Sequence, residues 1–227
     1  MTPVDVVVTE TAEDAAHAAA RHLAEAAGRG GHVALAGGST PRRAYALAGS
    51  LEPDWSRVSA WFGDERCVPL DDERSNHRLV RESLVEHLQQ PPFLRAVQTE
   101  LAPKNAAASY SQALEGIVLD LAFLGLGADG HTASLFPGAP SLDEHGACAV
   151  AVPAGLPPWV ERVTMTIPML SAAREIVFLA VGPDKAEAAR RAFGEPPSRA
   201  TPASLVRSTP GRTIVILDRE AAAGLRA

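Results

Sequence analysis

The chain has 227 residues, of which 46% are hydrophobic and 21% are charged, and its formal net charge is −6. This length and composition are those of an ordinary globular protein that can bury a sizeable core. The negative balance provides no cationic field for nucleic acid or an acidic membrane surface, so we expect neither as a partner.

Strands and helices alternate along almost the whole chain. Short β-branched or aliphatic runs predict strands, and the alanine-rich stretches between them predict helices. Thr11 and Asp14 form a capping box, and Gly28 and Gly30 stand where the first helix should end. In chain order we predict strand 4–8, helix 11–27, strand 32–36, helix 41–48, strand 57–62, helix 74–88, helix 105–117, strands 119–126, 147–152, 162–167 and 176–181, helix 184–193 and strand 213–217.

This alternation predicts one α/β domain over residues 1–227, with three layers in which helices cover both faces of a mostly parallel sheet. The polar or proline-rich segments 90–92 and 194–202 are interpreted as loops within that domain. In open parallel sheets the ligand binds outside the carboxyl ends of the strands. The loops that follow the strands are therefore where a functional site is expected.

The first of these loops reads Gly37-Gly38-Ser39-Thr40-Pro41. The glycines let backbone amides approach a ligand, the two hydroxyls add donors, and the start of a helix adds positive partial charge. The pattern predicts a site for a phosphate monoester, although it matches neither common nucleotide-binding motif. The alternative is a plain strand-to-helix turn with Thr40 as the N-cap and Pro41 as the first helical residue.

The second loop places three charged residues, Asp64-Glu65-Arg66, directly after a predicted strand. Asp64 could orient a sugar hydroxyl or a catalytic partner, and the planar fork of Arg66 could hold an oxyanion or a carboxylate. The alternative is a solvated charged loop. Farther on, Ser75 or Asn76 fits the cap of the next helix.

The third loop contains Asp129 and His131 between glycines. An imidazole can take a proton from water near neutral pH, and a carboxylate two residues away could hold the ring or contact substrate. The alternative is a histidine that caps a turn or lies at the surface. The flanking glycines favour the functional interpretation, because they expose both side chains at a strand end.

The fourth loop places Lys185 in the first turn of the predicted helix 184–193. A cation there is unfavourable against the helix dipole unless an anion lies close by, although a solvated lysine is the simpler alternative. Arg162, at the start of a predicted strand, is a second candidate cation.

The two cysteines, Cys67 and Cys148, lie far apart in the sequence and match no C-x-x-C spacing, which predicts neither a disulfide framework nor a zinc site. The N-terminus has no basic segment followed by a long apolar run. We therefore expect a cytoplasmic protein without a membrane segment.

Four segments together resemble the 6-phosphogluconolactonases. They are LAGGSTP at 35–41, GDERCV at 63–68 with SNHRL at 75–79, GLGADGHTASLFPG at 125–138, and VGPDKAEA at 181–188. They occur in the order expected of that family. The resemblance implies a Rossmann-like fold similar to glucosamine-6-phosphate deaminase and ribose-5-phosphate isomerase.

One departure distinguishes the two branches of this superfamily. In the deaminases the glycine-histidine loop ends in Asn-Glu-Pro, whose glutamate supports the ring-opening histidine. Here the corresponding residues are Leu135-Phe136-Pro137. Because phenylalanine cannot do acid-base work, the lactonase branch is favoured.

The resemblance implies hydrolysis of 6-phospho-D-glucono-1,5-lactone to 6-phosphogluconate in the pentose phosphate pathway, without a metal or an organic cofactor. His131 would act as general base and Arg66 would stabilise the oxyanion, while Asp64 and Asp129 would orient ring hydroxyls or His131. The implied substrate-binding residues are Gly37 and Asn76 and, for the 6-phosphate, Gly38, Ser39, Thr40, Arg162 and Lys185.

Other functions stay open at this point. Neither Ser39 nor Ser134 lies in a G-x-S-x-G elbow, which disfavours a serine esterase. A deaminase of glucosamine 6-phosphate would use the same phosphate loop and histidine. A catalytically silent sugar-phosphate sensor is the third candidate, although the sequence contains no helix-turn-helix or basic patch. The oligomeric state and the preferred ring form of the lactone are not indicated.

Overall fold

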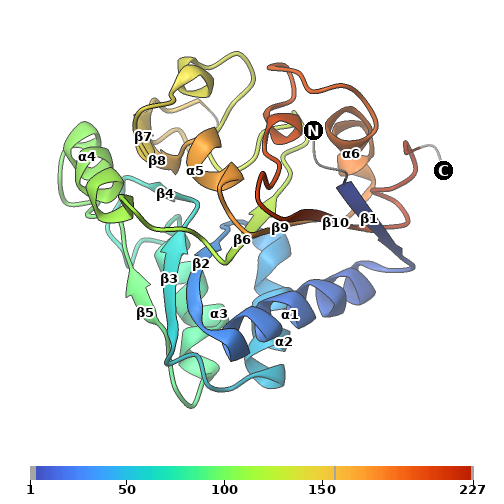
Figure 1. The fold of residues 1–227 in the computed structure, drawn as a ribbon, viewed down its shortest axis with the longest axis horizontal. Helices are drawn as coiled ribbons and strands as arrows, with labels where there is room; N and C mark the ends of the chain where they lie inside the picture. Colours follow the sequence, from blue (N-terminus) through green and yellow to red (C-terminus); the bar gives the residue numbers. More distant parts are fainter. Residues whose placement is uncertain (1–3, 156, 226–227) are drawn as a thin grey trace.

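Seven parallel strands form the central sheet (Figure 1). The computed structural model describes residues 4–155 and 157–225, and in it the strand order is β1-β10-β9-β6-β2-β3-β5, with every neighbouring pair parallel. The predicted mostly parallel sheet is confirmed. Its strands are β1 (Val4–Thr9), β2 (Gly31–Leu35), β3 (Val58–Phe62), β5 (Phe93–Arg95), β6 (Leu121–Gly125), β9 (Glu175–Ala180) and β10 (Arg212–Asp218).

Helices cover both faces of this sheet, as the alternation in sequence predicts (Figure 1). Strand β6 shows the two-sided burial clearly: Leu121 and Phe123 pack with α1, α2 and α3, whereas Ala122 and Leu124 pack with α4, α5 and α6. Successive side chains of a strand point to opposite faces, so a strand buried on both sides is apolar throughout. The helices are α1 (Ala12–Arg29), α2 (Ser39–Leu51), α3 (Asn76–Ser83), α4 (Pro103–Leu114), α5 (Ile167–Ser171) and α6 (Ala186–Phe193).

Local signals set most helix ends. The hydroxyl of Thr11 accepts a hydrogen bond from the backbone N–H of Asp14 at 3.1 Å, and Gly30, with φ of 79°, ends α1. The predicted helix 74–88 is shorter than expected, because α3 is followed by a separate 3-10 turn, Val85–His87. Among residues 4–155 and 157–225, no helix is long and apolar enough to cross a membrane.

A second, antiparallel sheet of three strands stands beside the carboxyl end of the main sheet. It contains β4 (Asp64–Arg66), β8 (Arg162–Met165) and β7 (Ala149–Val152), in the order β4-β8-β7. The prediction that the charged triplet at 64–66 is a loop is therefore wrong. Three consecutive charged residues are not typical of a strand. They form one here because they pair with β8, which lies far along the sequence.

The direction in which successive strands are added to the sheet changes between β2 and β6. From β2 the sheet continues outward through β3 to β5, and from β6 it continues the other way through β9 to β10 and β1. Loops that leave neighbouring strands in opposite directions open a crevice at their carboxyl ends, where ligands of such sheets bind. The fold therefore places the loops after β2 and β6 side by side.

Candidate active site

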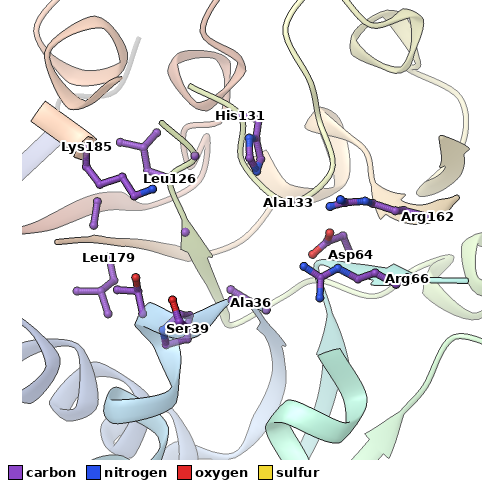
Figure 2. A pocket seen from close by; sticks show the side chains of 17 residues that line it. Ala36, Ser39, Asp64, Arg66, Leu126, His131, Ala133, Arg162, Leu179 and Lys185 are labelled. Carbon is purple, nitrogen blue, oxygen red and sulfur yellow. The ribbon is translucent and has the colours of Figure 1, made fainter. Parts of the chain in front are cut away.

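A cavity of about 230 Å³ lies at this crevice (Figure 2). Its walls come from the loops after β2, β6 and β9 and from the small sheet, so segments far apart in sequence meet around one space. Figure 2 shows His131 and Lys185 pointing into the same space as Ser39, Asp64 and the two arginines. Nine of the predicted site residues line it: Gly37, Gly38, Ser39, Thr40, Asp64, Arg66, His131, Arg162 and Lys185.

The start of α2 supplies one wall of the cavity. Helix α2 begins at Ser39 and is preceded by Gly38, whose φ of 97° suits a residue without a side chain. The alternative with Thr40 as N-cap is therefore wrong, and Pro41 is the third helical residue instead of the first. The first N–H groups of a helix have no partner within it, so this end of α2 offers donors and positive partial charge to an anion.

Gly37 is a position that requires glycine. A Cβ there would stand 1.8 Å from Oδ1 of Asn76, which is fully buried. The Nδ2 of Asn76 donates to the carbonyl of Asp64 at 2.8 Å and to its carboxylate at 3.1 Å. Asn76 is one of the predicted substrate-binding residues. It does not line the cavity but lies behind its wall, where it packs against Gly37 and holds Asp64 by hydrogen bonds.

Arg66 and Arg162 face the cavity as a cross-strand pair. They are register partners of β4 and β8, so their side chains leave the sheet on the same face. Burial lowers the pKa of Arg162, and the nearby carboxylate of Asp64 opposes this effect. Two cations opposite each other repel unless negative charge lies close. This pair is therefore suited to hold an anionic or strongly polarised oxygen.

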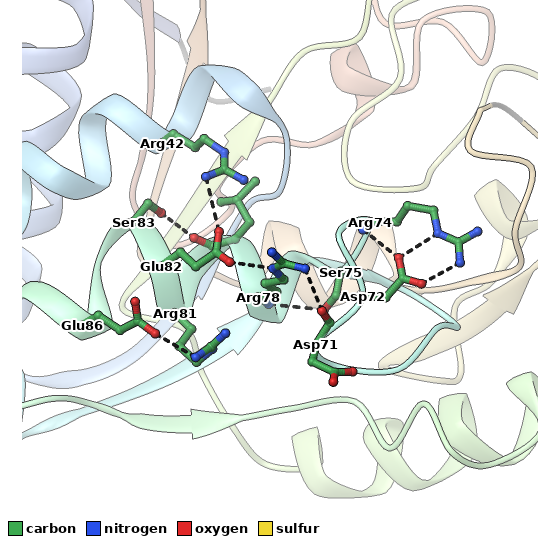
Figure 3. Close-up of polar contacts among 11 residues, drawn as sticks. Arg42, Asp71, Asp72, Arg74, Ser75, Arg78, Arg81, Glu82, Ser83 and Glu86 are labelled. Atoms are coloured by element: carbon green, nitrogen blue, oxygen red, sulfur yellow. Dashed lines mark hydrogen bonds and ion pairs between the residues drawn. The ribbon is translucent and has the colours of Figure 1, made fainter.

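The segment before α3, in which Arg74 pairs with Asp72 (Figure 3), supports Arg66. Nη1 of Arg66 donates to the carbonyl of Arg74 at 2.7 Å. Arg74 in turn forms two hydrogen bonds with the carboxylate of Asp72, at 2.8 and 2.7 Å, which hold the pKa of Asp72 well below its usual range. The ion pair between Arg74 and Asp72 thus stabilises the turn whose backbone carbonyl positions the Arg66 guanidinium.

Asp64 is held by neighbours other than His131. The hydroxyl of Ser134, a residue with no exposed surface, donates to one carboxylate oxygen of Asp64, and Asn76 donates to the other. The backbone N–H of Ser134 donates to Oγ1 of Thr164 at 3.2 Å. Ser134 is thus a supporting residue that the sequence analysis considered only as an esterase nucleophile, and its hydroxyl is already committed to Asp64.

Asp129 is the carboxylate that contacts His131. Oδ1 of Asp129 lies 2.6 Å from Nδ1 of His131 and accepts the backbone N–H of His131 at 3.1 Å. Burial raises the pKa of Asp129, but the hydrogen bonds from His131 together lower it, and the net shift is downward. With Nδ1 engaged, Nε2 is the imidazole nitrogen left for chemistry in the cavity. Asp129 itself is not among the residues that line the cavity.

Lys185 closes the side of the cavity next to β9. It ends a short 3-10 helix, Pro183–Lys185, and α6 starts only at Ala186, so the predicted single helix 184–193 is divided at this point. The Lys185 ammonium pairs with Asp184 at 2.9 Å. Both carboxylate oxygens of Asp218 accept the N–H of Gly182 at 3.0 Å, which fixes the start of this loop.

Three aromatic residues whose place the sequence leaves open do not contribute to the cavity wall. Within the described ranges 4–155 and 157–225, neither Trp61, Trp159 nor Phe136 lines it. The same ranges contain no group of three His, Cys, Asp or Glu side chains that could hold a metal ion. The absence of a metal requirement stays a prediction.

Comparison with known sequences supports the resemblance. A family model described as glucosamine-6-phosphate isomerases/6-phosphogluconolactonase matches residues 5–215. The 6-phosphogluconolactonase of Synechocystis sp. is 35% identical over 209 residues, which cover 86% of this chain and 85% of that protein. The human 6-phosphogluconolactonase is 37% identical over 175 residues, covering 74% of this chain and 68% of that protein.

Solved structures agree with these sequence matches. The 6-phosphogluconolactonase of Leishmania guyanensis has a TM-score of 0.87 at 26% identity, with all of both chains covered. That of Thermotoga maritima has a TM-score of 0.84 at 27% identity, covering 95% of this chain and 100% of the other. A monomeric glucosamine-6-phosphate deaminase, at 24% identity and a TM-score of 0.81, covers 97% of this chain and 99% of its own and shows the shared fold alone.

Proposed function

The chain belongs to the glucosamine-6-phosphate isomerase/6-phosphogluconolactonase family, and we propose that it hydrolyses 6-phospho-D-glucono-1,5-lactone to 6-phospho-D-gluconate in the oxidative pentose phosphate pathway. The observation that supports this most strongly is the cavity itself. It places an imidazole that is bonded to a carboxylate in the same space as a helix N-terminus and three cationic side chains. A phosphorylated sugar lactone has an anion at one end and an electrophilic carbonyl at the other.

The phosphate occupies the end of the cavity formed by α2 and Lys185. Free N–H groups at the start of α2, the hydroxyls of Ser39 and Thr40, and the Lys185 ammonium are suitable donors for a dianionic phosphate. Asp184, which pairs with Lys185 here, is two-thirds exposed and can turn to water when the phosphate arrives. Substrate binding therefore exchanges one surface ion pair for a stronger set of charge-assisted contacts.

Hydrolysis then follows from the His131–Asp129 pair. Asp129 holds the proton on Nδ1, so Nε2 accepts a proton from the attacking water as the water oxygen bonds to the lactone carbonyl carbon. When the tetrahedral intermediate collapses, the bond to the ring oxygen breaks and the imidazolium returns the proton to that oxygen. The products are a free hydroxyl and a carboxylic acid, which releases its proton to water to give the carboxylate. No covalent enzyme intermediate is needed.

The arginine pair stabilises the charge that develops on the carbonyl oxygen. The resemblance implies that Arg162 binds the phosphate, but its register partner is Arg66, so we assign both guanidiniums to the lactone end. Fixed cations aimed at a developing oxyanion are among the largest contributions to catalysis. Asp64, which accepts hydrogen bonds from Ser134 and Asn76, offers a carboxylate acceptor to ring hydroxyls.

The direct test is acid release from freshly prepared 6-phosphogluconolactone, followed in a pH-stat against the uncatalysed rate without protein. We expect the wild-type protein to accelerate hydrolysis and to release no ammonia from glucosamine 6-phosphate. Ammonia release at a rate comparable with lactone hydrolysis would favour the isomerising deaminase. Binding of 6-phosphogluconate without turnover of either compound would favour the silent sensor.

Replacing Lys185 with alanine should raise KM and leave kcat nearly unchanged. A phosphate contact is equally strong in the ground state and the transition state, so its loss removes uniform binding. A hydrogen bond to a charged group is worth about 1.5–3 kcal/mol, which corresponds to an increase in KM of about 10- to 100-fold. Initial rates over a range of lactone concentrations give both constants.

The chain contains one other lysine, Lys104, which is exposed on α4 and provides a matched control. Lys104→Ala should leave both constants at wild-type values. A large fall in kcat for Lys185→Ala, with KM unchanged, would contradict the assignment of Lys185 to the phosphate.

We propose a cytoplasmic protein in which residues 1–227 form one domain, and a reaction that needs neither metal nor organic cofactor. Dialysis against a chelator is then expected to leave the rate of lactone hydrolysis unchanged.

A further inference from the structure

Phe136 lies behind two of the groups that face the cavity. Its ring centroid is 5.2 Å from that of His131, with the two rings tilted by 56°. The guanidinium carbon of Arg162 stands over the same ring, 5.3 Å from its centroid. The phenyl ring is thus in contact with an imidazole from the loop after β6 and a guanidinium from strand β8. Within residues 4–155 and 157–225 it is not among the residues that line the cavity.

The imidazole of His131 is restrained from several directions. Asp129 holds Nδ1, and the Nδ1–Cε1 edge packs so closely on Gly127 that a Cβ there would lie 2.1 Å from Nδ1. The hydrogen bond and this backbone contact both act at that edge of the ring. The Phe136 ring is a further side-chain contact of the imidazole, made with the ring itself.

Arg162 depends on the same ring for a different reason. Its side chain is buried, with an exposed fraction of 3% for the whole residue, and it donates to the carbonyl of Pro157 at 3.1 Å. A guanidinium over the face of an aromatic ring is attracted by the ring quadrupole, and this attraction is stronger where water is excluded. Phe136 therefore helps to keep a buried cation in one orientation.

We propose that Phe136 is a positioning residue that holds the imidazole of His131 and the guanidinium of Arg162 at a fixed separation on either side of the reacting carbonyl. This inference rests on the proposed lactone hydrolysis. General-base attack needs the water oxygen and the carbonyl carbon within about 3–3.5 Å, and a displacement of about 1 Å can cost 10²-fold in rate. A single rigid ring that contacts both groups limits such displacement.

The test compares Phe136→Leu, which keeps an apolar side chain but removes the aromatic ring, with Phe136→Tyr, which keeps the ring. Phe136→Leu should lower kcat by about 10- to 100-fold, because base and cation lose their common contact. KM should change by much less, since Lys185 and the start of α2 do not contact Phe136. Phe136→Tyr should restore most of kcat. Phe93→Leu, at an exposed phenylalanine on β5, is the matched control and should behave as wild type.

A second measurement reports on the position of His131 without any turnover. The ring current of Phe136 shifts the Cε1–H resonance of the His131 imidazole, which is identified by its absence from the spectrum of His131→Ala. We expect this resonance to move toward that of a free histidine in Phe136→Leu and to stay near its wild-type position in Phe136→Tyr. Thermal unfolding of both variants shows whether they remain folded at the assay temperature.

The inference is overturned if Phe136→Leu keeps the wild-type kcat, if the Leu and Tyr variants lose kcat equally, or if the His131 resonance does not move. The proposed lactone hydrolysis is tested separately, by the wild-type protein. If the wild-type protein has no lactonase activity, the proposed hydrolysis is overturned. That result would also overturn the catalytic purpose assigned to Phe136, even with the expected shift of the resonance.

Discussion

The variant His131→Ala should lose most of the lactonase turnover. The imidazole is the group in the cavity that is oriented by a carboxylate and can take a proton from water near neutral pH, and general-base catalysis contributes about 10²–10⁴-fold to such reactions. We therefore expect kcat to fall by a factor in that range. Initial rates in a pH-stat, corrected for spontaneous lactone hydrolysis, measure this directly.

Substrate affinity should survive the same substitution. The proposed phosphate contacts come from Lys185 and the start of α2, which His131 does not touch, so the dissociation constant of 6-phosphogluconate should change little. His145, exposed near the 3-10 turn Pro140–Asp143, provides the control, and His145→Ala should be fully active. Unchanged turnover in His131→Ala would refute the assignment of the general base.

Replacing Arg66 with alanine should produce the second large effect. Arg66 faces the cavity from β4, beside its register partner Arg162, and its guanidinium is fixed by the carbonyl of Arg74. Loss of one donor to an oxyanion lowers kcat by about 10²–10³-fold in comparable sites. We expect a fall of this size, measured with the same assay, and a smaller fall for Arg66→Lys, which keeps the charge but not the planar fork.

Added guanidine separates a role in catalysis from a role in folding. If Arg66 stabilises the oxyanion, free guanidinium should enter the space left in Arg66→Ala and restore part of the rate in a concentration-dependent way. The exposed Arg219 supplies the control, and Arg219→Ala should neither lose activity nor respond to guanidine. A wild-type kcat in Arg66→Ala would show that the oxyanion is stabilised elsewhere.

The sequence was sufficient to predict the main sheet and the loops of the site because these depend on local chemistry. Apolar runs on strands such as β6 and β9 indicate burial on both faces, and glycines with hydroxyl residues after β2 indicate an anion site at the start of a helix. The crevice between β2 and β6 follows from the general behaviour of parallel sheets. His131, Arg66 and Lys185 were therefore recognisable before their neighbours were known.

The parts that sequence reasoning missed depend on long-range pairing. β4 is a strand because β8 pairs with it, and that pairing places Arg162 beside Arg66 at the cavity. The contacts that distinguish the two aspartates were equally hidden, since Ser134 and Asn76 meet Asp64 only in space. No spacing within one loop encodes such contacts. The short edge strand β5, with three residues, was missed for the same reason.

In the proposed mechanism one sugar phosphate spans the cavity from the start of α2 to His131. The most direct measurement is a crystal structure with 6-phosphogluconate bound. We expect its phosphate to contact Ser39, Thr40 and Lys185, with the carboxylate beside Arg66 and within reach of Nε2 of His131. A phosphate held between Arg66 and Arg162, with the carboxylate pointing away from His131, would contradict the account.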